Sequence, residues 1–404
     1  MLSEALKKKA EMALTKKPVY GLDLDVSEFE PKHVDLNVES LDSLDEELSS
    51  SMESVGLSLS EKSTLGGYIQ VDQTSVYSLS RKSGLTILNL REALKQFDFL
   101  REFYWRLIPV DLDKFTALAA LYEESGYVIV AEKGFKSENP IQACLLVKSP
   151  RSLQTPHNIV IAGEGVNLHV ITGCTTAPES FGLHVGISEF YVGRNATVTF
   201  TMIHSWSRAS HVRPRTAVLV EDGGRFISNY VILKPASSIQ TYPSIRLVGG
   251  NTSAVSTSVV LGSGSANIDV GSSVSLESKG SNCRIISRVV GGGSSETVTR
   301  SRISALVDGV KGHTECNGII VSDGASIVAI PELEAKAENV ELTHEAAIGK
   351  ISEEEIFYLQ TRGFTREEAV SLIVGGFLES GLSDLPTSVE KYLRSAIQSA
   401  LTGL

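Results

Sequence analysis

The segment TSAVSTSVVLGSGSANIDV, residues 252–270, shows the pattern that decides the fold. It consists of short runs of small, β-branched and hydroxyl-bearing residues, separated by glycine and serine. Similar runs recur between residues 127 and 348, as in YVIVAEKG, QACLLV and NIVIAGEG. Short apolar or alternating runs that are bounded by Gly, Pro and Asn are typical of β-strands. Helical spacers are absent, which argues against a βαβ sheet and leaves a β-sandwich or a stacked β-solenoid.

The composition and charge of the chain exclude several classes of protein. Of its 404 residues, 42% are hydrophobic and 21% are charged, which is enough for a sizeable core. The net charge of −11 argues against nucleic-acid binding, which depends on Lys and Arg neutralising phosphates. No apolar run approaches the roughly 18 to 20 residues of a membrane span, and the N-terminal MLSEALKKKAEMAL is amphipathic rather than a secretory signal. We therefore expect a cytoplasmic protein without a nucleic-acid or membrane partner.

The region before the strand pattern, residues 1–126, is predicted to be helical. Residues 1–17 have the composition of a short helix, and residues 88–108 carry apolar side chains at helical spacings of three and four. Residues 35–65 are rich in Ser, Asp and Glu and contain no aromatic side chain, so little burial offsets the entropy cost of ordering them. We expect a mobile acidic segment there, followed by a β core at residues 127–349.

The pattern becomes helical again in residues 350–404. Capping boxes, in which a hydroxyl residue precedes a glutamate by three positions, predict helix starts at Ser352, Thr365 and Thr387. The third predicted helix carries an apolar stripe from Val389 to Leu401. Such a stripe needs to be buried, either on neighbouring helices of this chain or on a partner.

The last strand-like segment, GHTECNGIIVSDGASIVAIPELEAKAENVELTHEAAIGK, holds the strongest candidates for metal chemistry. Its thiol, imidazoles and carboxylates of interest are Cys316, His344, Glu345, His313 and Glu315. Thiolate, imidazole and carboxylate are all metal ligands. Alternation along VELTHEAAI places His344 and Glu345 on opposite faces of a flat strand, so both reach one metal ion only if the strand bends or two subunits contribute. From the residues alone, Cys316 could equally be a buried, unreactive cysteine and His344 a histidine of the core.

A second thiol, Cys174, lies in VNLHVITGCTTAP, where alternation aligns it with Val170. A half-buried strand would therefore point this thiol inward, and a buried thiol without a reactive role is the alternative. The same alternation in ATVTFTMIHSW aligns His204 with Trp206.

The chain's four cysteines show no CxxC spacing. Reduced thiols suit a large intracellular protein better than a disulfide framework does. Cys144 and Cys283 match no motif, and we interpret both as packing residues.

Five further segments stand out in order along the chain, namely FYWRLIPVDLDKFTALAA, ITGCTTAP, FTMIHSW, QTYPSIRLVGGN and SEEEIFYLQTRG. They resemble, in the same order, segments of the SufB/SufD family of SUF-type iron–sulfur cluster assembly scaffolds. The last resembles the family's ExQLFYxxxRG, and the interval from Cys316 to Glu345 resembles that between the SufB cysteine and its HEAT-like segment. The resemblance covers roughly residues 100–404. It implies a mainly β fold, a right-handed parallel β-helix with helical regions at both ends.

The resemblance also implies a cluster site. Cys316 matches the SufB cysteine on which a cluster is built. His344 matches the histidine offered by SufD, and Glu345 matches a SufB glutamate.

A route for sulfur is implied as well. Cys174 matches a SufB cysteine that receives sulfur and passes it through the interior of the β-helix, together with His204, Trp206 and Arg213. The chain departs from the family here, because SufB has Gln in place of His204. A shorter loop also leaves either Arg213 or Arg215 as the basic residue of the route.

The resemblance further implies a scaffold that is not itself an enzyme. Iron and sulfide would assemble on it into a transient [4Fe–4S] cluster for apo iron–sulfur proteins, and the question of a bound flavin is left open. A SufC-type ATPase would bind the C-terminal helices. Because this chain carries both the SufB-type cysteine and the SufD-type histidine, we expect a two-fold homodimer with a shared cluster site.

Two other functions are compatible with parts of the sequence. A SufD-like structural partner would carry no cluster of its own, but chains of that type typically lack the cysteine at Cys316. A β-helix enzyme acting on polysaccharide would need carboxylates grouped on one exterior face, and the sequence shows no such periodic set.

Overall fold

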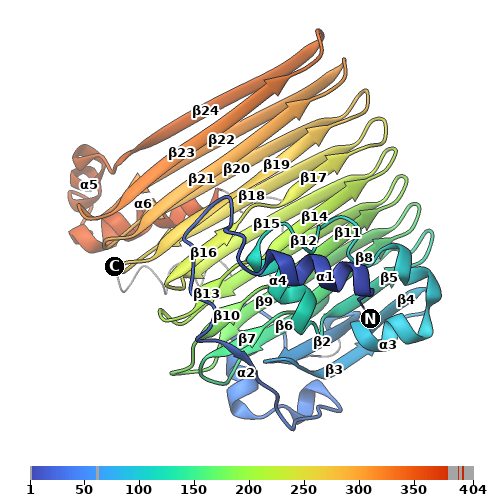
Figure 1. The fold of residues 1–404 in the computed structure, drawn as a ribbon. Helices are drawn as coiled ribbons and strands as arrows, with labels where there is room; N and C mark the ends of the chain where they lie inside the picture. The colour runs from blue at the N-terminus through green and yellow to red at the C-terminus, as the bar shows by residue number, and fades with distance from the viewer. Residues whose placement is uncertain (1, 61–62, 381–389, 391–393, 395–404) are drawn as a thin grey trace.

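The computed structural model describes residues 2–60, 63–380, 390 and 394. Its centre is a parallel β-solenoid of about 8 turns with helices at both ends (Figure 1). This arrangement confirms the predicted mainly β class. It also shows that the fold is a β-solenoid and not a β-sandwich. The predicted helix start at Thr387 and the apolar stripe from Val389 to Leu401 lie outside the described residues.

Each turn of the solenoid adds one strand to one sheet and either one strand or two shorter pieces to the other, and it takes 27 to 31 residues, as in the registers His211↔Ser238 and Val128↔Ile159. One sheet has the order β24 (Val340–Lys350), β22 (Val310–Ile320), β20 (Asn282–Gly291), β18 (Ser253–Gly262), β15 (Arg225–Lys234), β12 (Thr197–Ser205), β9 (Asn167–Thr176), β6 (Ile141–Val147), β2 (Gly66–Val71) and β3 (Thr74–Ser80). We call it the long-strand sheet.

The opposite sheet, here the split-strand sheet, is built from shorter pieces in its early turns. Its strands are β1 (Glu30–Pro31), β7 (Ser152–Gln154), β10 (Gly182–His184), β13 (His211–Val212), β16 (Ser238–Thr241), β17 (Ser244–Leu247), β14 (Arg215–Val220), β11 (Ile187–Val192), β8 (His157–Ala162), β5 (Tyr127–Ala131), β4 (Leu85–Asn89), β19 (Asn267–Leu276), β21 (Glu296–Ala305) and β23 (Ser326–Ala335). Pro156, Pro214 and Pro243 lie in breaks between the pieces, because proline has no N–H for the ladder.

Strands β2, β3 and β4 belong to the region that the sequence predicted to be helical. Their runs are rich in β-branched and aromatic residues and begin the two sheets, with antiparallel pairs β2–β3 and β4–β5. Helices α3 (Leu90–Gln96) and η3 (Asp98–Glu102) then follow, as the sequence pattern indicated.

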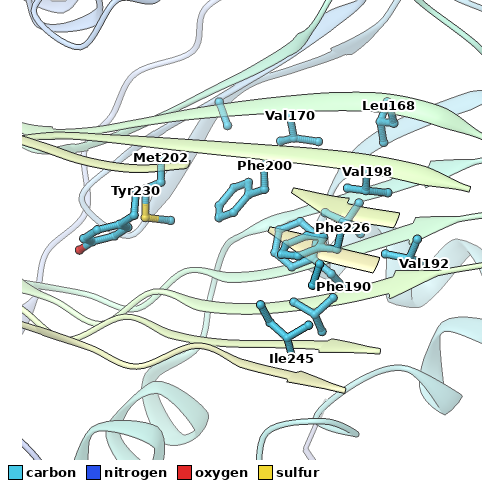
Figure 2. Packing of buried hydrophobic residues seen from close by; sticks show 14 of the residues in the cluster. Leu168, Val170, Phe190, Val192, Val198, Phe200, Met202, Phe226, Tyr230 and Ile245 are labelled. Atoms are coloured by element: carbon cyan, nitrogen blue, oxygen red, sulfur yellow. The ribbon is translucent and has the colours of Figure 1, made fainter. Parts of the chain in front are cut away.

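The solenoid interior is packed with apolar side chains that alternate along both sheets. Phe190 packs between Phe200 and Phe226, with ring centroids 4.7 and 5.4 Å apart. Met202 and Tyr230 continue this row towards one side of the interior (Figure 2). The turns also stack too closely for a side chain at Gly271 of β19, where a Cβ would lie 1.8 Å from a backbone oxygen of β21.

The outer face of the long-strand sheet is covered by segments from both ends of the chain. Helix α2 (Glu46–Glu53), preceded by η1 (Leu41–Ser43), covers its early strands through the buried side chains of Leu48 and Met52. Helix α6 (Arg366–Glu379), which follows α5 (Glu353–Gln360), covers later strands through Val374 and Leu378. The acidic segment expected to be mobile therefore contributes an amphipathic helix to the core, because its few apolar residues lie on one face.

The outer face of the split-strand sheet is covered by α1 (Glu4–Ala13), α4 (Lys114–Tyr122) and the connection that follows α1. We call residues 14–33 the strap. Its Tyr20 ring lies under the Arg300 guanidinium, 4.4 Å from it, and the Gly21 N–H donates to Asp269. Asp269 also pairs with Arg300, so the strap is held by the late turns of the solenoid.

A buried ion triad fixes the segment between η3 and α4 to the early turns. The imidazole of His157 lies between two carboxylates, with Nδ1 2.5 Å from Glu123 and Nε2 2.9 Å from Glu189. Burial alone would lower the pKa of His157, but Glu123 and Glu189 outweigh it and raise the pKa to about 9. Glu189 also accepts three backbone N–H bonds from residues 105–108, and Glu123 accepts two from the aromatic side chains of residues 104–105.

Candidate functional site

The first candidate group lies in the last turn of the solenoid. Cys316 is on β22 and faces inward, with 2% of its surface exposed. Burial raises the pKa of its thiol, while hydrogen bonds from Thr299, Thr314 and Ser301 act in the opposite direction. The thiol therefore lies in a hydroxyl-lined pocket of the interior, one strand from the end of the sheet.

His344 and Glu345 lie on β24, the last strand beside β22. The register pairs Thr314 with His344 and Cys316 with Ala346, so His344 shares the inward parity of Cys316 and lies diagonally beside it. Glu345 has the opposite parity, and both side chains are exposed. Across the described part of the chain, no three Cys, His, Asp or Glu side chains converge to hold a metal ion. One chain thus brings Cys316 and His344 to neighbouring strands, but it does not assemble a complete ligand set.

The two extra candidates beside the thiol have partners on the outer face. Glu315 accepts hydrogen bonds from Arg288 at 2.6 Å and Asn317 at 2.8 Å. His313 Nδ1 lies 2.7 Å from the hydroxyl of Thr343.

The second candidate group lies inside the early turns. Cys174 on β9 is fully buried and is the direct lateral neighbour of His204 on β12. The indole Nε1–H of Trp206 donates to His204 Nδ1 at 2.6 Å. Burial raises the pKa of the Cys174 thiol, and burial together with His184 lowers the pKa of His204, so both groups are neutral. The predicted trio of Cys174, His204 and Trp206 is therefore one cluster.

Two members of this cluster were missed by sequence reasoning. The ring of Tyr230 on β15 lies 4.7 Å from that of His204, and the ring of His184 on β10 lies 5.2 Å from that of Trp206. Each belongs to a different strand from the trio. Only the pairing of distant turns brings them to Cys174, so no local spacing could have identified them.

Arg213 does not join this cluster. Val212 faces the interior, so Arg213 points to the outer face, where its guanidinium donates to the carbonyls of Ser238 and Leu22. Burial and the neighbouring Arg215 lower the pKa of Arg213 to about 9. Arg215 also lies outside the interior and pairs with Asp113 at 2.7 Å. Neither arginine lines the interior near Cys174.

A column of polar side chains connects the two groups through the interior. In successive turns the register aligns Tyr230 with Ser258, Ser258 with Ser287, and Ser287 with Cys316. Neighbouring strands lie about 4.8 Å apart, so the three steps span roughly 14 Å. Ser272 on the opposite sheet adds a buried hydroxyl without a partner. Buried hydroxyl groups therefore line this part of the interior between the early cluster and Cys316.

A groove of about 760 Å³ lies beside the early cluster, between α2 and the ends of β9 and β12. Trp206 contributes to its wall together with Thr175 and Ser205, the sequence neighbours of Cys174 and His204. Carboxylates of α2, including Glu46, line the other side. Trp206 therefore belongs both to the cluster and to the wall of a surface groove.

These features define a parallel β-solenoid whose interior carries a row of hydroxyl side chains between one thiol in its early turns and another near its last turn. Within the described ranges, no helix is both long and apolar enough to span a membrane.

Comparison with known proteins identifies the family of the chain. Residues 145–377 match the family described as SUF system FeS cluster assembly, SufBD core domain. The chain is 40% identical to an iron–sulfur cluster assembly SufBD family protein of Methanothermobacter thermautotrophicus, over 100% of both chains. It is 42% identical to one of Archaeoglobus fulgidus, over 86% of this chain and 94% of the other. A relative from Staphylococcus epidermidis is 26% identical over 96% and 86%. The chain belongs to the SufBD family of iron–sulfur cluster assembly proteins.

Proposed function

We propose that this protein is a SufB-like scaffold on which iron and sulfide assemble into a transient [4Fe–4S] cluster, which then passes to apo-proteins. The observation that carries the proposal is the position of Cys316. Its thiol is on the inner face of the last turn, next to the strand that bears His344 and Glu345. Soft thiolate is the ligand that iron–sulfur clusters require, and imidazole and carboxylate can complete an iron site.

The cluster is proposed to form between two copies of the chain. The last turn leaves inward-facing apolar side chains uncovered, with Leu333 41% and Ile348 39% exposed. An exposed strand edge and an open apolar end favour association, and two-fold pairing is the commonest closed form. A second copy would bring its own His344 towards Cys316 and supply the ligands that one chain lacks.

Sulfur is proposed to enter at Cys174 and to reach Cys316 through the hydroxyl-lined column. This route is supported by the groove beside the early cluster and by the register from Tyr230 to Cys316. Polar side chains can solvate a small sulfur species that an apolar core would exclude.

ATP hydrolysis is assigned to a SufC-type ATPase that docks on the C-terminal helices. Helix α5 exposes two neighbouring aromatic side chains, Phe357 at 67% and Tyr358 at 57%. Exposed aromatic residues are typical anchors of protein interfaces.

Anaerobic reconstitution with iron and sulfide, followed by visible absorption and iron analysis, tests the scaffold function. Wild-type protein is expected to bind a cluster, and Cys316→Ser is expected to lose most of the iron while folding normally. Cys283→Ser is the matched control, because Cys283 is also a buried interior thiol of the late turns. Full reconstitution of Cys316→Ser would refute the role of Cys316 as a cluster ligand, and failure of the wild type to bind a cluster would instead indicate a SufD-like structural partner.

A carbohydrate-active function is disfavoured by the exterior of the solenoid. Carboxylates on its outer faces are used in ion pairs, as in Asp269 with Arg300, Glu315 with Arg288 and Glu334 with Arg302. A hydrolytic pair of carboxylates would need to face a substrate.

A further inference from the structure

We propose that His204, His184 and Tyr230 form a binding site for the outer sulfur of a persulfide carried by Cys174. This inference rests on the proposed function and specifies the sulfur species that the early cluster holds. It starts from three buried polar atoms that have no partner in the structure, namely His204 Nε2, His184 Nε2 and the Tyr230 hydroxyl. Buried polar groups are almost always hydrogen-bonded, so three such atoms in the cluster that contains Cys174 point to a ligand.

His204 offers a donor. Its Nδ1 accepts the indole N–H of Trp206, which can only donate. The neutral imidazole therefore carries its proton on Nε2, and this N–H is the atom without a partner. Because Cys174 is its lateral neighbour, His204 is placed to donate to a sulfur atom on that residue.

His184 offers an acceptor. Its Nδ1 lies 2.7 Å from the side-chain oxygen of Gln154, whose amide nitrogen is held by two backbone carbonyls. The orientation of Gln154 is thus fixed, and His184 Nδ1 must donate to it. Burial lowers the pKa of His184 to about 3, so the ring is neutral and Nε2 presents a free lone pair.

Together these groups present one N–H donor, one nitrogen acceptor and one hydroxyl that can do either. A halide or sulfate ion would use only the donors. A terminal S–H or S⁻ group uses both kinds, since it can accept from His204 and Tyr230 and, when protonated, donate to His184. The aromatic rings of Trp206 and Tyr230 add the polarizable contacts that sulfur favours.

The loading step needs a persulfide donor, R–S–SH, from outside the protein. Cys174 Sγ bonds to the sulfane sulfur of the donor while the donor's S–S bond breaks, and the thiol proton of Cys174 passes to the departing R–S⁻. The products are Cys174–S–SH and R–SH. The transferred sulfur keeps its oxidation state, so no other oxidant or reductant is consumed. The groove walled by Trp206 is the side from which the donor approaches.

The test is to equilibrate the protein with inorganic polysulfide and to measure, by peptide mass spectrometry, the fraction of each cysteine that gains one sulfur atom. In Tyr230→Phe and His204→Leu, the loading equilibrium at Cys174 is expected to fall about tenfold or more, as for the loss of a hydrogen bond to a charged group. His204→Gln, whose side chain can accept from Trp206 and still donate, is expected to load normally.

Tyr230→Phe separates a binding role from a structural one. It removes a buried hydroxyl that has no partner, so the thermal stability of the fold should be unchanged or higher while sulfur loading falls. If wild-type Cys174 gains no sulfur, the relay in the proposed function is refuted. If Cys174 loads equally in wild type, Tyr230→Phe and His204→Leu, the relay stands and the binding site proposed here is overturned.

Discussion

The buried imidazole of His157 should make the stability of this protein depend on pH in a defined direction. Its pKa is raised from the ordinary 6.5 to about 9 by Glu123 and Glu189. A group whose pKa is raised on folding contributes stability that is fully present below the unfolded pKa and is lost as pH rises through the folded one. Moving the pKa of an imidazole that far is worth about 3 kcal/mol below pH 6.5, and this contribution should vanish by about pH 10.

The perturbation that isolates this contribution is His157→Gln. In the variant, Glu189 keeps its three backbone N–H donors and Glu123 keeps its two aromatic donors, so neither carboxylate is left without a hydrogen-bond partner. Loss of the imidazolium from a buried ion network is expected to destabilise the protein by about 3–5 kcal/mol near neutral pH. The free energies of unfolding of both proteins are measured by urea titration at about pH 6 and about pH 10.

The informative quantity is the difference in the free energy of unfolding between the wild type and His157→Gln. Other titrating groups contribute equally to both proteins, so their contributions cancel in this difference. It should be larger at about pH 6 than at about pH 10 by about 3 kcal/mol. A difference that stays constant across this range would refute the charged state assigned to His157. A difference that grows with pH would mean that the imidazole is buried neutral.

Mixing Cys316→Ser with His344→Ala subunits should restore part of the iron that each variant loses alone, because the mixed dimer keeps one intact pair; no recovery, or a monomer by light scattering, would exclude a shared site. Phe357→Ala should weaken co-purification with the ATPase without changing the thermal unfolding of the scaffold, and an unchanged complex would move the docking surface away from α5. Gly271→Ala should destabilise the fold by about 1–3 kcal/mol or more, because its Cβ has no space between two turns. Gly376→Ala, on α6 with no atom within 4 Å of its Cβ, should instead stabilise by about 0.5–1 kcal/mol, and equal effects in thermal melts would contradict the close stacking of the turns.

Alternation along single strands was sufficient to predict part of the early cluster. Cys174 shares its parity with Val170, and His204 shares its parity with Trp206, and the structure turns both pairs inward. Such a prediction works because a one-residue shift would expose an entire apolar face. Alternation does not predict which strands are neighbours. His184 was therefore identified as a member of the cluster only from the stacking of the turns in the structure.

The basic residue and the acidic segment show where the same reasoning fails. Arg213 follows a strand of two residues and precedes a proline, so no run of alternating residues fixes its direction. Its side chain points outward, where the guanidinium donates hydrogen bonds to backbone carbonyl groups. In residues 35–65 the acidic composition obscured Leu48 and Met52, whose spacing of four puts both on one helical face.

The strap has a consequence for how the chain is made. In a simple solenoid each turn contacts only its neighbours, so turns can form or be lost one at a time. Here Tyr20 and Gly21 rest on Arg300 and Asp269, which are separated from them by well over half of the chain. On the ribosome, the strap leaves the exit tunnel long before Arg300 has been synthesised, so Tyr20 and Gly21 stay without these partners until residue 300 has folded, although Leu22 and Asp23 can already meet Arg213 and Lys114. Docking of Tyr20 and Gly21 is thus a late event of biosynthesis that reports the completion of most turns, and it ties the loss of the late turns to the release of this part of the strap.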